Sequence, residues 1–252
     1  ASEDMLKPAA TYDALRAAVR WEVPDAYNIG IDVCDCWAAR DPDRVALIHV
    51  GEDGRGRDYS YGMLRAQSNR LAHLLAELGV GRGDRVAVLL PQAPETAIGH
   101  IAIYKLGAIA VPLFGLFGPE ALQYRLANSG AKAVLTNGDG MTKLAGIRAA
   151  LPDLRHILVV DGPVAGALDL KRELEGRPED FAAAPTQAED PALIIYTSGT
   201  TGQPKGALHG HRVLLGHLPG VEMSHDLLPQ PGDRIWTPAD WAWAGGLLDA
   251  LL

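Results

Sequence analysis

Cysteine is scarce in this chain, and its scarcity excludes two kinds of small scaffold. The 252 residues contain only two cysteines, Cys34 and Cys36. Two cysteines this close together are too few for a disulfide framework and too few for a structural zinc site. We therefore expect two reduced cysteines in a cytoplasmic protein.

Basic charge and long apolar runs are lacking as well. Lys and Arg number 23 against 31 Asp and Glu, so the net charge is −8, whereas nucleic-acid-binding proteins are expected to carry a basic surplus. The longest apolar stretch, residues 106–118, contains Gly and Pro and is too short to span a bilayer. The opening residues ASEDMLKPAA lack the apolar core of a signal peptide. The sequence therefore predicts neither nucleic acid nor a membrane as a partner.

Apolar residues are abundant, at 48% against 21% charged, which is enough to bury a core. Residues 61–78 have apolar positions at helical spacing. Ser60 precedes them as a candidate N-cap, and Gly79 follows the last of them. The expected strands are residues 45–50, 85–90, 108–113, 131–136, 156–160 and 192–196, and the expected helices are 61–78, 95–106 and 119–128. This alternation predicts an α/β fold with βαβ units and a mostly parallel β-sheet flanked by helices.

The segment after the last predicted strand has an unusual composition. Residues 197–206, TSGTTGQPKG, contain four hydroxyls, three glycines and one lysine. Glycines allow backbone amides to point toward one anion, and a lysine adds a mobile positive charge for phosphates. Lys205 is followed by Gly206, so this is not a Walker A loop, and Ser198 does not stand in a GxSxG elbow. Composition alone leaves a ligand-free flexible loop open as the alternative.

The string YTSGTTGQPKG, residues 196–206, resembles the signature phosphate loop of the adenylate-forming superfamily. That superfamily includes acyl-CoA synthetases, luciferases and the adenylation domains of peptide synthetases. Three further segments resemble the N-terminal region of acetyl-CoA-synthetase-like enzymes, namely DPDRVALI (41–48), GVGRGDRVAVLLPQAPE (79–95) and YKLGAIAVPLF (104–114). The resemblance therefore favours an ATP-binding loop over a ligand-free one.

The resemblance implies a two-step reaction with ATP, Mg²⁺ and CoA. A small carboxylic acid attacks the α-phosphate of Mg-ATP to give an acyl-adenylate and pyrophosphate, and the thiol of CoA then displaces AMP. The implied protein contribution is positioning and charge stabilisation. By position in the motif, the residues implied to bind the ATP phosphates are Thr197, Ser198, Gly199, Thr200, Thr201, Gly202 and Lys205.

A second segment, WTPADWAWAGG at residues 236–246, resembles the family motif that helps to form the acyl pocket. The residues implied to line this pocket are Ala239, Asp240, Trp241 and Trp243. The family commonly reads Ala-Asp-x-Gly-Trp, whereas here Ala242 replaces the glycine, which leaves the size of the pocket open. The alternative is an aromatic core cluster in which Asp240 caps a helix.

The turn FGLFG, residues 114–118, matches the turn that contacts CoA in acetyl-CoA-synthetase-like relatives, which implies Phe114 and Gly115 as CoA-binding residues. The simpler alternative is an apolar turn that packs on a neighbouring helix. Four histidines follow the phosphate motif, at positions 209, 211, 217 and 225. We expect no metal site there, because no acidic or cysteine partner stands at a matching spacing.

The resemblance also implies that the chain is the N-terminal portion of a larger enzyme. Relatives carry later motifs, including a Tyr-Gly-x-Thr-Glu motif and a C-terminal domain with a catalytic lysine, and the chain instead ends in the apolar helical pattern GGLLDALL. We expect an incomplete large domain that is inactive by itself, lacks its C-terminal domain and exposes apolar surface that favours a homo-oligomer.

The expected divisions are a wrapping segment (1–40), a first α/β sub-domain (41–160), a surface excursion or joint (161–191), and the phosphate loop with the start of the acyl pocket (192–252). The function implied for the whole is an ATP-dependent acid–CoA ligase. The alternatives are an adenylation domain that loads a carrier protein and a non-catalytic nucleotide-binding fragment.

Overall fold

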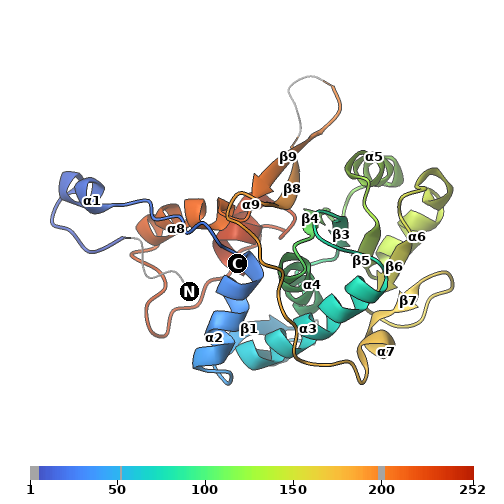
Figure 1. Cartoon of the computed structure of the whole chain (residues 1–252), viewed down its shortest axis with the longest axis horizontal. Helices are drawn as coiled ribbons and strands as arrows, with labels where there is room; N and C mark the ends of the chain where they lie inside the picture. The colour runs from blue at the N-terminus through green and yellow to red at the C-terminus, as the bar shows by residue number, and fades with distance from the viewer. Residues whose placement is uncertain (1–5, 52, 198–201) are drawn as a thin grey trace.

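The molecule is built around one mixed β-sheet, shown in Figure 1. The structure is a computed structural model that describes residues 6–51, 53–197 and 202–252. Within those residues, seven strands form a sheet in the order β7-β6-β5-β3-β4-β8-β9. The strands are β3 (Arg85–Leu89), β4 (Ile109–Pro112), β5 (Ala133–Thr136), β6 (His156–Val159), β7 (Leu168–Asp169), β8 (Pro191–Thr197) and β9 (Lys205–Gly210). All neighbouring pairs are parallel except β8 and β9, so the predicted mostly parallel sheet is confirmed.

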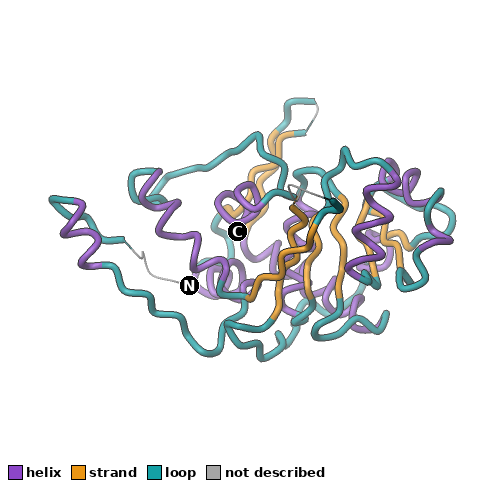
Figure 2. The backbone as a smooth tube through the Cα atoms, turned by 90° about the horizontal axis from the view of Figure 1, so that it is seen from above, coloured by secondary structure: helices purple, strands orange, loops and turns teal. Residues whose placement is uncertain are grey.

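The central strands are buried on both faces because helices cover each side (Figure 2). Helices α3 (Tyr61–Glu77) and α4 (Pro94–Lys105) pack on one face, and α5 (Pro119–Ser129) and α6 (Gly138–Ala145) pack on the other. Residues of β3 alternate between the two cores, with Val86 and Val88 in one and Ala87 and Leu89 in the other. This alternation explains why the strand sequences read as continuous apolar runs.

Local sequence signals set the bounds of the helices. The Ser60 side chain accepts a hydrogen bond from the backbone N–H of Met63 at 3.3 Å, which confirms it as the N-cap of α3. Gly79, just past the end of α3, has a φ of +79°, a conformation that favours glycine. Prolines occupy the first turns of α4 and α5, where their missing N–H is tolerated.

One predicted strand lies outside the main sheet. The strand predicted at residues 45–50 is β1 (Val45–Val50), but it pairs antiparallel with β2 (Gly56–Ser60) in a separate two-stranded sheet. It therefore belongs to a hairpin rather than to a βαβ unit. The hairpin leads into α3 and is followed by the parallel strands of the main sheet.

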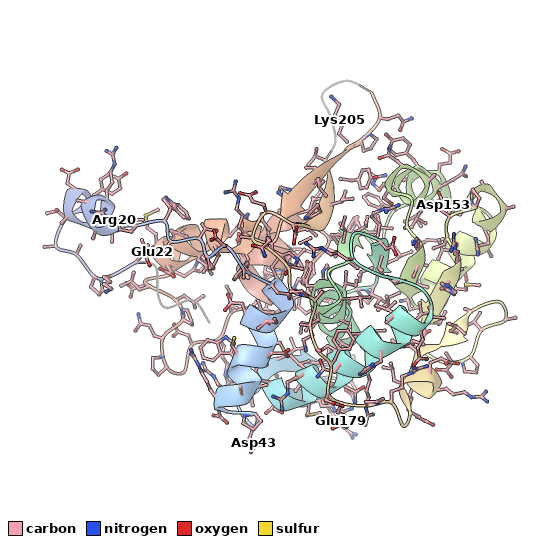
Figure 3. The ribbon with its side chains drawn as sticks, viewed as in Figure 1. Arg20, Glu22, Asp43, Asp153, Glu179 and Lys205 are labelled. Atoms are coloured by element: carbon pink, nitrogen blue, oxygen red, sulfur yellow. The ribbon has the colours of Figure 1, made fainter. Side chains whose placement is uncertain are left out.

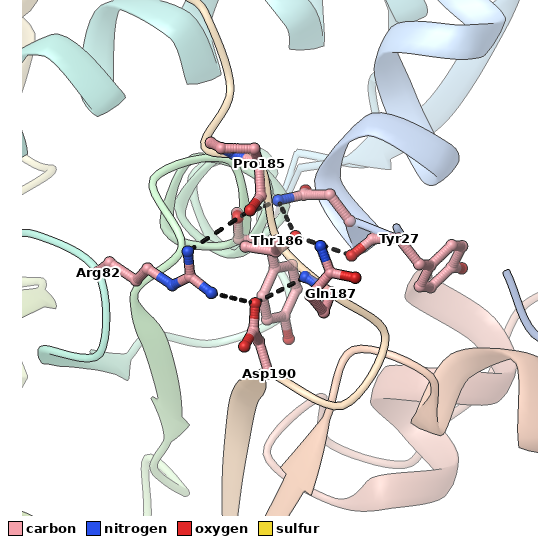
Figure 4. A network of polar contacts seen from close by, with 8 residues as sticks. Tyr27, Arg82, Pro185, Thr186, Gln187 and Asp190 are labelled. Atoms are coloured by element: carbon pink, nitrogen blue, oxygen red, sulfur yellow. Dashed lines mark hydrogen bonds and ion pairs between the residues drawn. The ribbon is translucent and has the colours of Figure 1, made fainter. Parts of the chain in front are cut away.

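The segment before β8 is fastened into the body of the molecule (Figure 4). After β7 and α7 (Leu170–Leu174), the chain returns to β8 past the N-terminal segment. The backbone N–H of Tyr27 donates to the carbonyl of Thr186 at 3.1 Å, and the Thr186 hydroxyl donates to the carbonyl of Tyr27 at 2.7 Å. Arg82 forms an ion pair with Asp190 at 2.5 Å. Thr186 is 3% exposed, so the residue that makes these hydrogen bonds is itself buried.

The remaining helices are short and surround these layers. They are α1 (Tyr12–Ala18), the π-helix η1 (Ile31–Asp35), α2 (Cys36–Arg40), the 3₁₀ helix η2 (Arg148–Ala150), α8 (Val213–Ser224), α9 (Ala244–Gly246) and the π-helix η3 (Leu247–Leu251). Helix α1 has no buried residue, whereas Leu247 and Leu248 of η3 join the core. In the part of the chain described, no helix is both long enough and apolar enough to cross a membrane.

Candidate functional site

The β8–β9 hairpin holds the two ends of the glycine- and hydroxyl-rich segment. Tyr196 is paired with Gly206, and Thr197 with Lys205. Thr197 and Lys205 are exposed, and Figure 3 shows Lys205 at the far end of the hairpin, away from the body of the sheet. Gly202 has a φ of +92°, which a residue with a side chain rarely adopts. Four implied phosphate-binding residues, Ser198, Gly199, Thr200 and Thr201, lie outside the described residues.

Gly206 is required by a close approach between the two strands. A Cβ atom at this position would lie 2.8 Å from Cγ2 of Ile194 and 3.2 Å from Cζ of Tyr196. The absent side chain therefore lets the Tyr196 ring lie against β9. The ring in turn brings its hydroxyl to helix α5.

Helix α5 anchors both ends of this segment, through residues that the sequence reasoning missed. The Tyr196 hydroxyl donates to Oδ1 of Asn128 at 2.7 Å. The Tyr124 hydroxyl donates to the carbonyl of Pro204 at 3.0 Å. The Arg125 guanidinium lies over the ring of Tyr196, 5.7 Å from its centre. No sequence signal marked these side chains, because polar residues on an amphipathic helix are expected to face solvent.

An open cavity of about 670 Å³ lies at the carboxyl ends of β3 and β4. Its lining residues are Pro91, Gln92, Phe114, Pro238, Ala239, Asp240 and Trp243. The connection from β3 to β4 runs through α4 on one face, and the connection from β4 to β5 runs through α5 on the other. The loops that leave the carboxyl ends of β3 and β4 therefore turn toward opposite faces of the sheet, and the cavity opens beside both strand ends.

Two distant segments meet at this cavity. The Phe114 and Trp243 rings are 5.8 Å apart between centroids. The Gln92 side-chain amide donates to the carbonyls of Ala239, at 2.6 Å, and Thr237, at 3.2 Å. Gln92 thereby fastens the Trp-rich segment to the end of β3. Phe114, implied by resemblance as a CoA residue, thus shares one cavity with three of the four residues implied for the acyl pocket.

Asp240 is the ionisable residue in the lining of this cavity. Its Oδ1 accepts a hydrogen bond from the backbone N–H of Ala242 at 2.7 Å. Burial raises the pKa of the Asp240 carboxyl, and that hydrogen bond acts against the rise. The carboxyl stabilises a turn rather than a helix, because α9 begins later, at Ala244, with Trp243 as its N-cap.

Two of the implied residues lie beside the cavity rather than in its lining. Trp241 is half-buried and is not among the lining residues. Gly115 is also outside the lining, and its carbonyl accepts a hydrogen bond from Nζ of Lys143 at 2.5 Å. Lys143, on α6, therefore holds the turn at residues 114–118 in place.

The four histidines after the phosphate motif are dispersed. His211 is buried, and its Nδ1 accepts from the backbone N–H of Ile29 at 3.2 Å. His217 contacts Asp249 at 2.6 Å. Among the described residues, no group of three or more His, Cys, Asp or Glu side chains is arranged to hold a metal ion.

The chain is similar over most of its length to several acetyl-coenzyme A synthetases. It is 32% identical to acetyl-coenzyme A synthetase of Xanthobacter autotrophicus, covering 94% of this chain and 39% of that protein. It is 33% identical to acetyl-coenzyme A synthetase of Streptomyces coelicolor, over 90% of this chain and 38% of that protein.

Solved structures of CoA ligases also match most of this chain. The crystal structure of an acyl-CoA synthetase from Brucella canis superposes with a TM-score of 0.80 at 30% identity, over 90% of this chain and 41% of that one. An anthranilate CoA ligase in complex with anthranoyl-AMP superposes with a TM-score of 0.79 at 27% identity, over 91% and 44%. The chain thus spans about two fifths of the length of the relatives it matches.

The family model described as AMP-binding enzyme matches residues 34–252. That match includes the sheet, the β8–β9 hairpin and every residue that lines the cavity. The chain belongs to the AMP-binding enzyme family, and it corresponds to the N-terminal portion of acetyl-CoA-synthetase-like members.

Proposed function

We propose that the chain forms the phosphate- and acid-binding part of an ATP-dependent carboxylic acid–CoA ligase. The observation that carries the proposal is the convergence of Phe114, Asp240 and Trp243 on one cavity at the carboxyl ends of β3 and β4. The names of the relatives support the same class, because they are acetyl-CoA synthetases, an acyl-CoA synthetase and an anthranilate CoA ligase.

The proposed chemistry begins with attack by a carboxylate oxygen on the α-phosphorus of ATP. The bond to the β-phosphate oxygen breaks, pyrophosphate leaves, and an acyl-adenylate forms. The sulfur of CoA then attacks the acyl carbon, and AMP leaves with the electron pair of the broken C–O bond. The protein contributes mainly position and electrostatic stabilisation to such transfers.

In this proposal the glycine- and hydroxyl-rich segment holds the β- and γ-phosphates, the future leaving group. Lys205 and the hydroxyl of Thr197 stand on adjacent strands at its base. Local positive charge is needed there because the chain as a whole carries a net charge of −8. Mg²⁺ would neutralise charge on the departing pyrophosphate, and we assign no residue of this chain to it.

The cavity is proposed to receive the acid. Phe114 and Trp243 offer apolar ring surface, while Gln92 and Asp240 offer polar groups. Turn residues 114–118 would then lie between the acid and the incoming thiol, which is consistent with the implied contact of Phe114 and Gly115 with CoA. We also propose that turnover needs protein outside these 252 residues, since the relatives are much longer.

The test uses the intact protein that contains this chain. Offered a panel of short, medium-chain and aromatic acids, it should catalyse acid-dependent exchange of labelled pyrophosphate into ATP, and mass spectrometry should detect an acyl-CoA product. Adenylate without thioester would instead favour transfer to a carrier protein. The 252-residue chain alone should bind ATP without forming acyl-adenylate.

Lys205→Ala tests the phosphate assignment, with Lys171→Ala as its control. Lys171 is an exposed lysine on α7, remote in sequence from the phosphate motif. Lys205→Ala should slow pyrophosphate exchange by roughly tenfold or more, because one charge-assisted hydrogen bond contributes about 1.5–3 kcal/mol. An exchange rate equal to that of Lys171→Ala would refute the assignment.

A further inference from the structure

A series of ring contacts leads away from the cavity toward helix α5. The Trp243 ring faces Phe114, and Phe114 meets Phe117 edge to face at 5.7 Å between centroids. At the other end, Tyr196 of β8 meets Tyr124 of α5 at 6.4 Å. The first group belongs to the cavity and its turn, and the second belongs to the base of the glycine- and hydroxyl-rich segment.

Arg125 joins these two groups of rings. Its guanidinium carbon lies 4.0 Å from the centre of the Phe117 ring and 5.7 Å from the centre of the Tyr196 ring. Phe117 belongs to the turn that places Phe114 in the cavity lining, while Tyr196 immediately precedes Thr197. One side chain therefore contacts both the acid-binding side and the phosphate-binding side of the site.

The surroundings of Arg125 show what holds its guanidinium. The residue is only 8% exposed, and within the described chain no carboxylate forms an ion pair with it. Its Nη1 donates to the carbonyl of Ala121 at 2.9 Å, and its buried Nε has no hydrogen-bond partner. Burial lowers the pKa of this guanidinium. Besides the Ala121 carbonyl, the faces of the two rings are the contacts that stabilise its charge among the described residues.

The choice of arginine follows from this geometry. A planar guanidinium can lie against aromatic faces, whereas a lysine ammonium is a compact, strongly hydrated point charge. A buried cation without a carboxylate is costly, so it is expected only where its neighbours fix its position. Once the guanidinium is fixed in place, its contacts with Phe117 and Tyr196 set the separation between the turn and the end of β8.

We propose that Arg125 is a positioning residue that sets the separation between the turn at residues 114–118 and the end of β8. It thereby aligns the cavity with Thr197 and Lys205, which stand at the end of the β8–β9 hairpin. The interpretation of the two sides as acid-binding and phosphate-binding rests on the function proposed above, but the mechanical link between them does not. The two parts can therefore be tested separately.

The first experiment tests the link without any ligand. The 252-residue chain is labelled with 5-fluorotryptophan, and the ¹⁹F resonance of Trp243 is identified by its loss in Trp243→Phe. Arg125→Met should shift the Trp243 resonance, although the two side chains touch only through Phe114 and Phe117.

Arg85→Met is the matched control for this experiment. Arg85 also donates to the end of α5, at the carbonyls of Ser129 and Gly130, but it contacts none of the rings in the series. Its replacement should leave the Trp243 resonance in place. A Trp243 resonance that moves no further in Arg125→Met than in Arg85→Met would overturn the proposal, whether or not the chain binds ATP.

The second experiment measures tripolyphosphate binding to the same chain by calorimetry. Arg125→Met should raise the dissociation constant roughly tenfold, the scale of one desolvated cation–π contact. Arg125→Lys should recover only part of the affinity, since it restores charge without a planar group. Full recovery in Arg125→Lys would overturn the proposal, because charge alone would then suffice.

Phe117→Leu keeps the proposal testable if Arg125→Met does not fold. It removes the ring under the guanidinium from the cavity side and leaves every residue of β8 unchanged. Tripolyphosphate should then bind several-fold more weakly, whereas an unchanged affinity would overturn the link. Absence of binding by the wild-type chain would contradict the phosphate assignment, and the fluorine experiment would still decide the role of Arg125.

Discussion

Two buried histidines should make this fold sensitive to mild acid. His100 on α4 is 0% exposed, its Nδ1 lies 3.0 Å from the Tyr104 hydroxyl, and burial lowers its pKa to about 3. His211 is also 0% exposed, and burial lowers its pKa to about 4 although the charge of Asp190 acts to raise it. Each buried Nε2 lacks a hydrogen-bond partner in the described structure, so neither ring can readily accommodate a proton.

The sign and size of the effect follow from proton linkage. In the unfolded chain both histidines take up protons below their ordinary pKa of about 6.5, whereas the folded chain does so only near pH 3 to 4. Their contribution to stability is therefore intact above pH 6.5 and declines as the pH falls toward 4. At pH 5.5 each histidine should have lost on the order of 1 kcal/mol of its contribution to the free energy of unfolding.

Urea unfolding at pH 7.5 and pH 5.5 measures this loss, which should be about 2–3 kcal/mol in the wild-type chain. In the double variant His100→Asn/His211→Asn most of the difference should disappear, because asparagine offers an acceptor near the Nδ1 position and does not titrate. The double variant should keep a smaller loss of stability in acid, because burial also lowers the pKa of His209. His225→Asn, at an exposed position, is the control. A double variant that loses as much stability as wild type would refute the reasoning.

Three further perturbations test packing and the cavity. Gly206→Ala should lower the free energy of unfolding in denaturant by about 1–3 kcal/mol, because the Cβ atom of the alanine has no room. Its control, Gly216→Ala, lies in open space on α8 and should raise the free energy of unfolding by about 0.5–1 kcal/mol. Lys105→Met should lower the free energy of unfolding by about 3–5 kcal/mol, because Asp35, which lies 2.6 Å from the Lys105 ammonium, loses its cation. Adding Asp35→Asn should restore part of the lost thermal stability. Gln92→Leu should weaken acid binding more than ATP binding in calorimetry, since it releases two carbonyls of the Trp-rich segment.

The parallel core of the fold could be predicted because its strands carry their own signal. β3, β4, β5 and β6 are short, mainly apolar and separated by helices, so both faces of each strand are expected to be buried. The strand at residues 45–50 is predicted, but its hairpin partner β2 is not, because the sequence GRDYS of β2 has no apolar run. The apolar run of β1 therefore marks it as a strand, whereas no pattern in the sequence marks β2 as its partner.

The candidate site was predictable only where residues adjacent in sequence act together. The resemblance implied two separate roles for Phe114 and Trp243, and their positions in the sequence gave no reason to place them in contact. Their contact arises because the parallel neighbours β3 and β4 end side by side, and the Gln92 amide after β3 holds residues 237–239 near the end of β4. Long-range packing of this kind is set by the topology of the sheet, which no local pattern records.

The outer half of the β8–β9 hairpin depends on helix α5 for support. β8 is in register with β4 at a single pair, Ala110 and Leu193, and its remaining length pairs only with β9. A two-stranded ribbon is marginally stable by itself, so its outer half needs another support. Tyr124 and Tyr196 provide that support through hydrogen bonds to Pro204 and α5. Because α5 also follows the turn that lines the cavity, a displacement of this helix must move both halves of the site together.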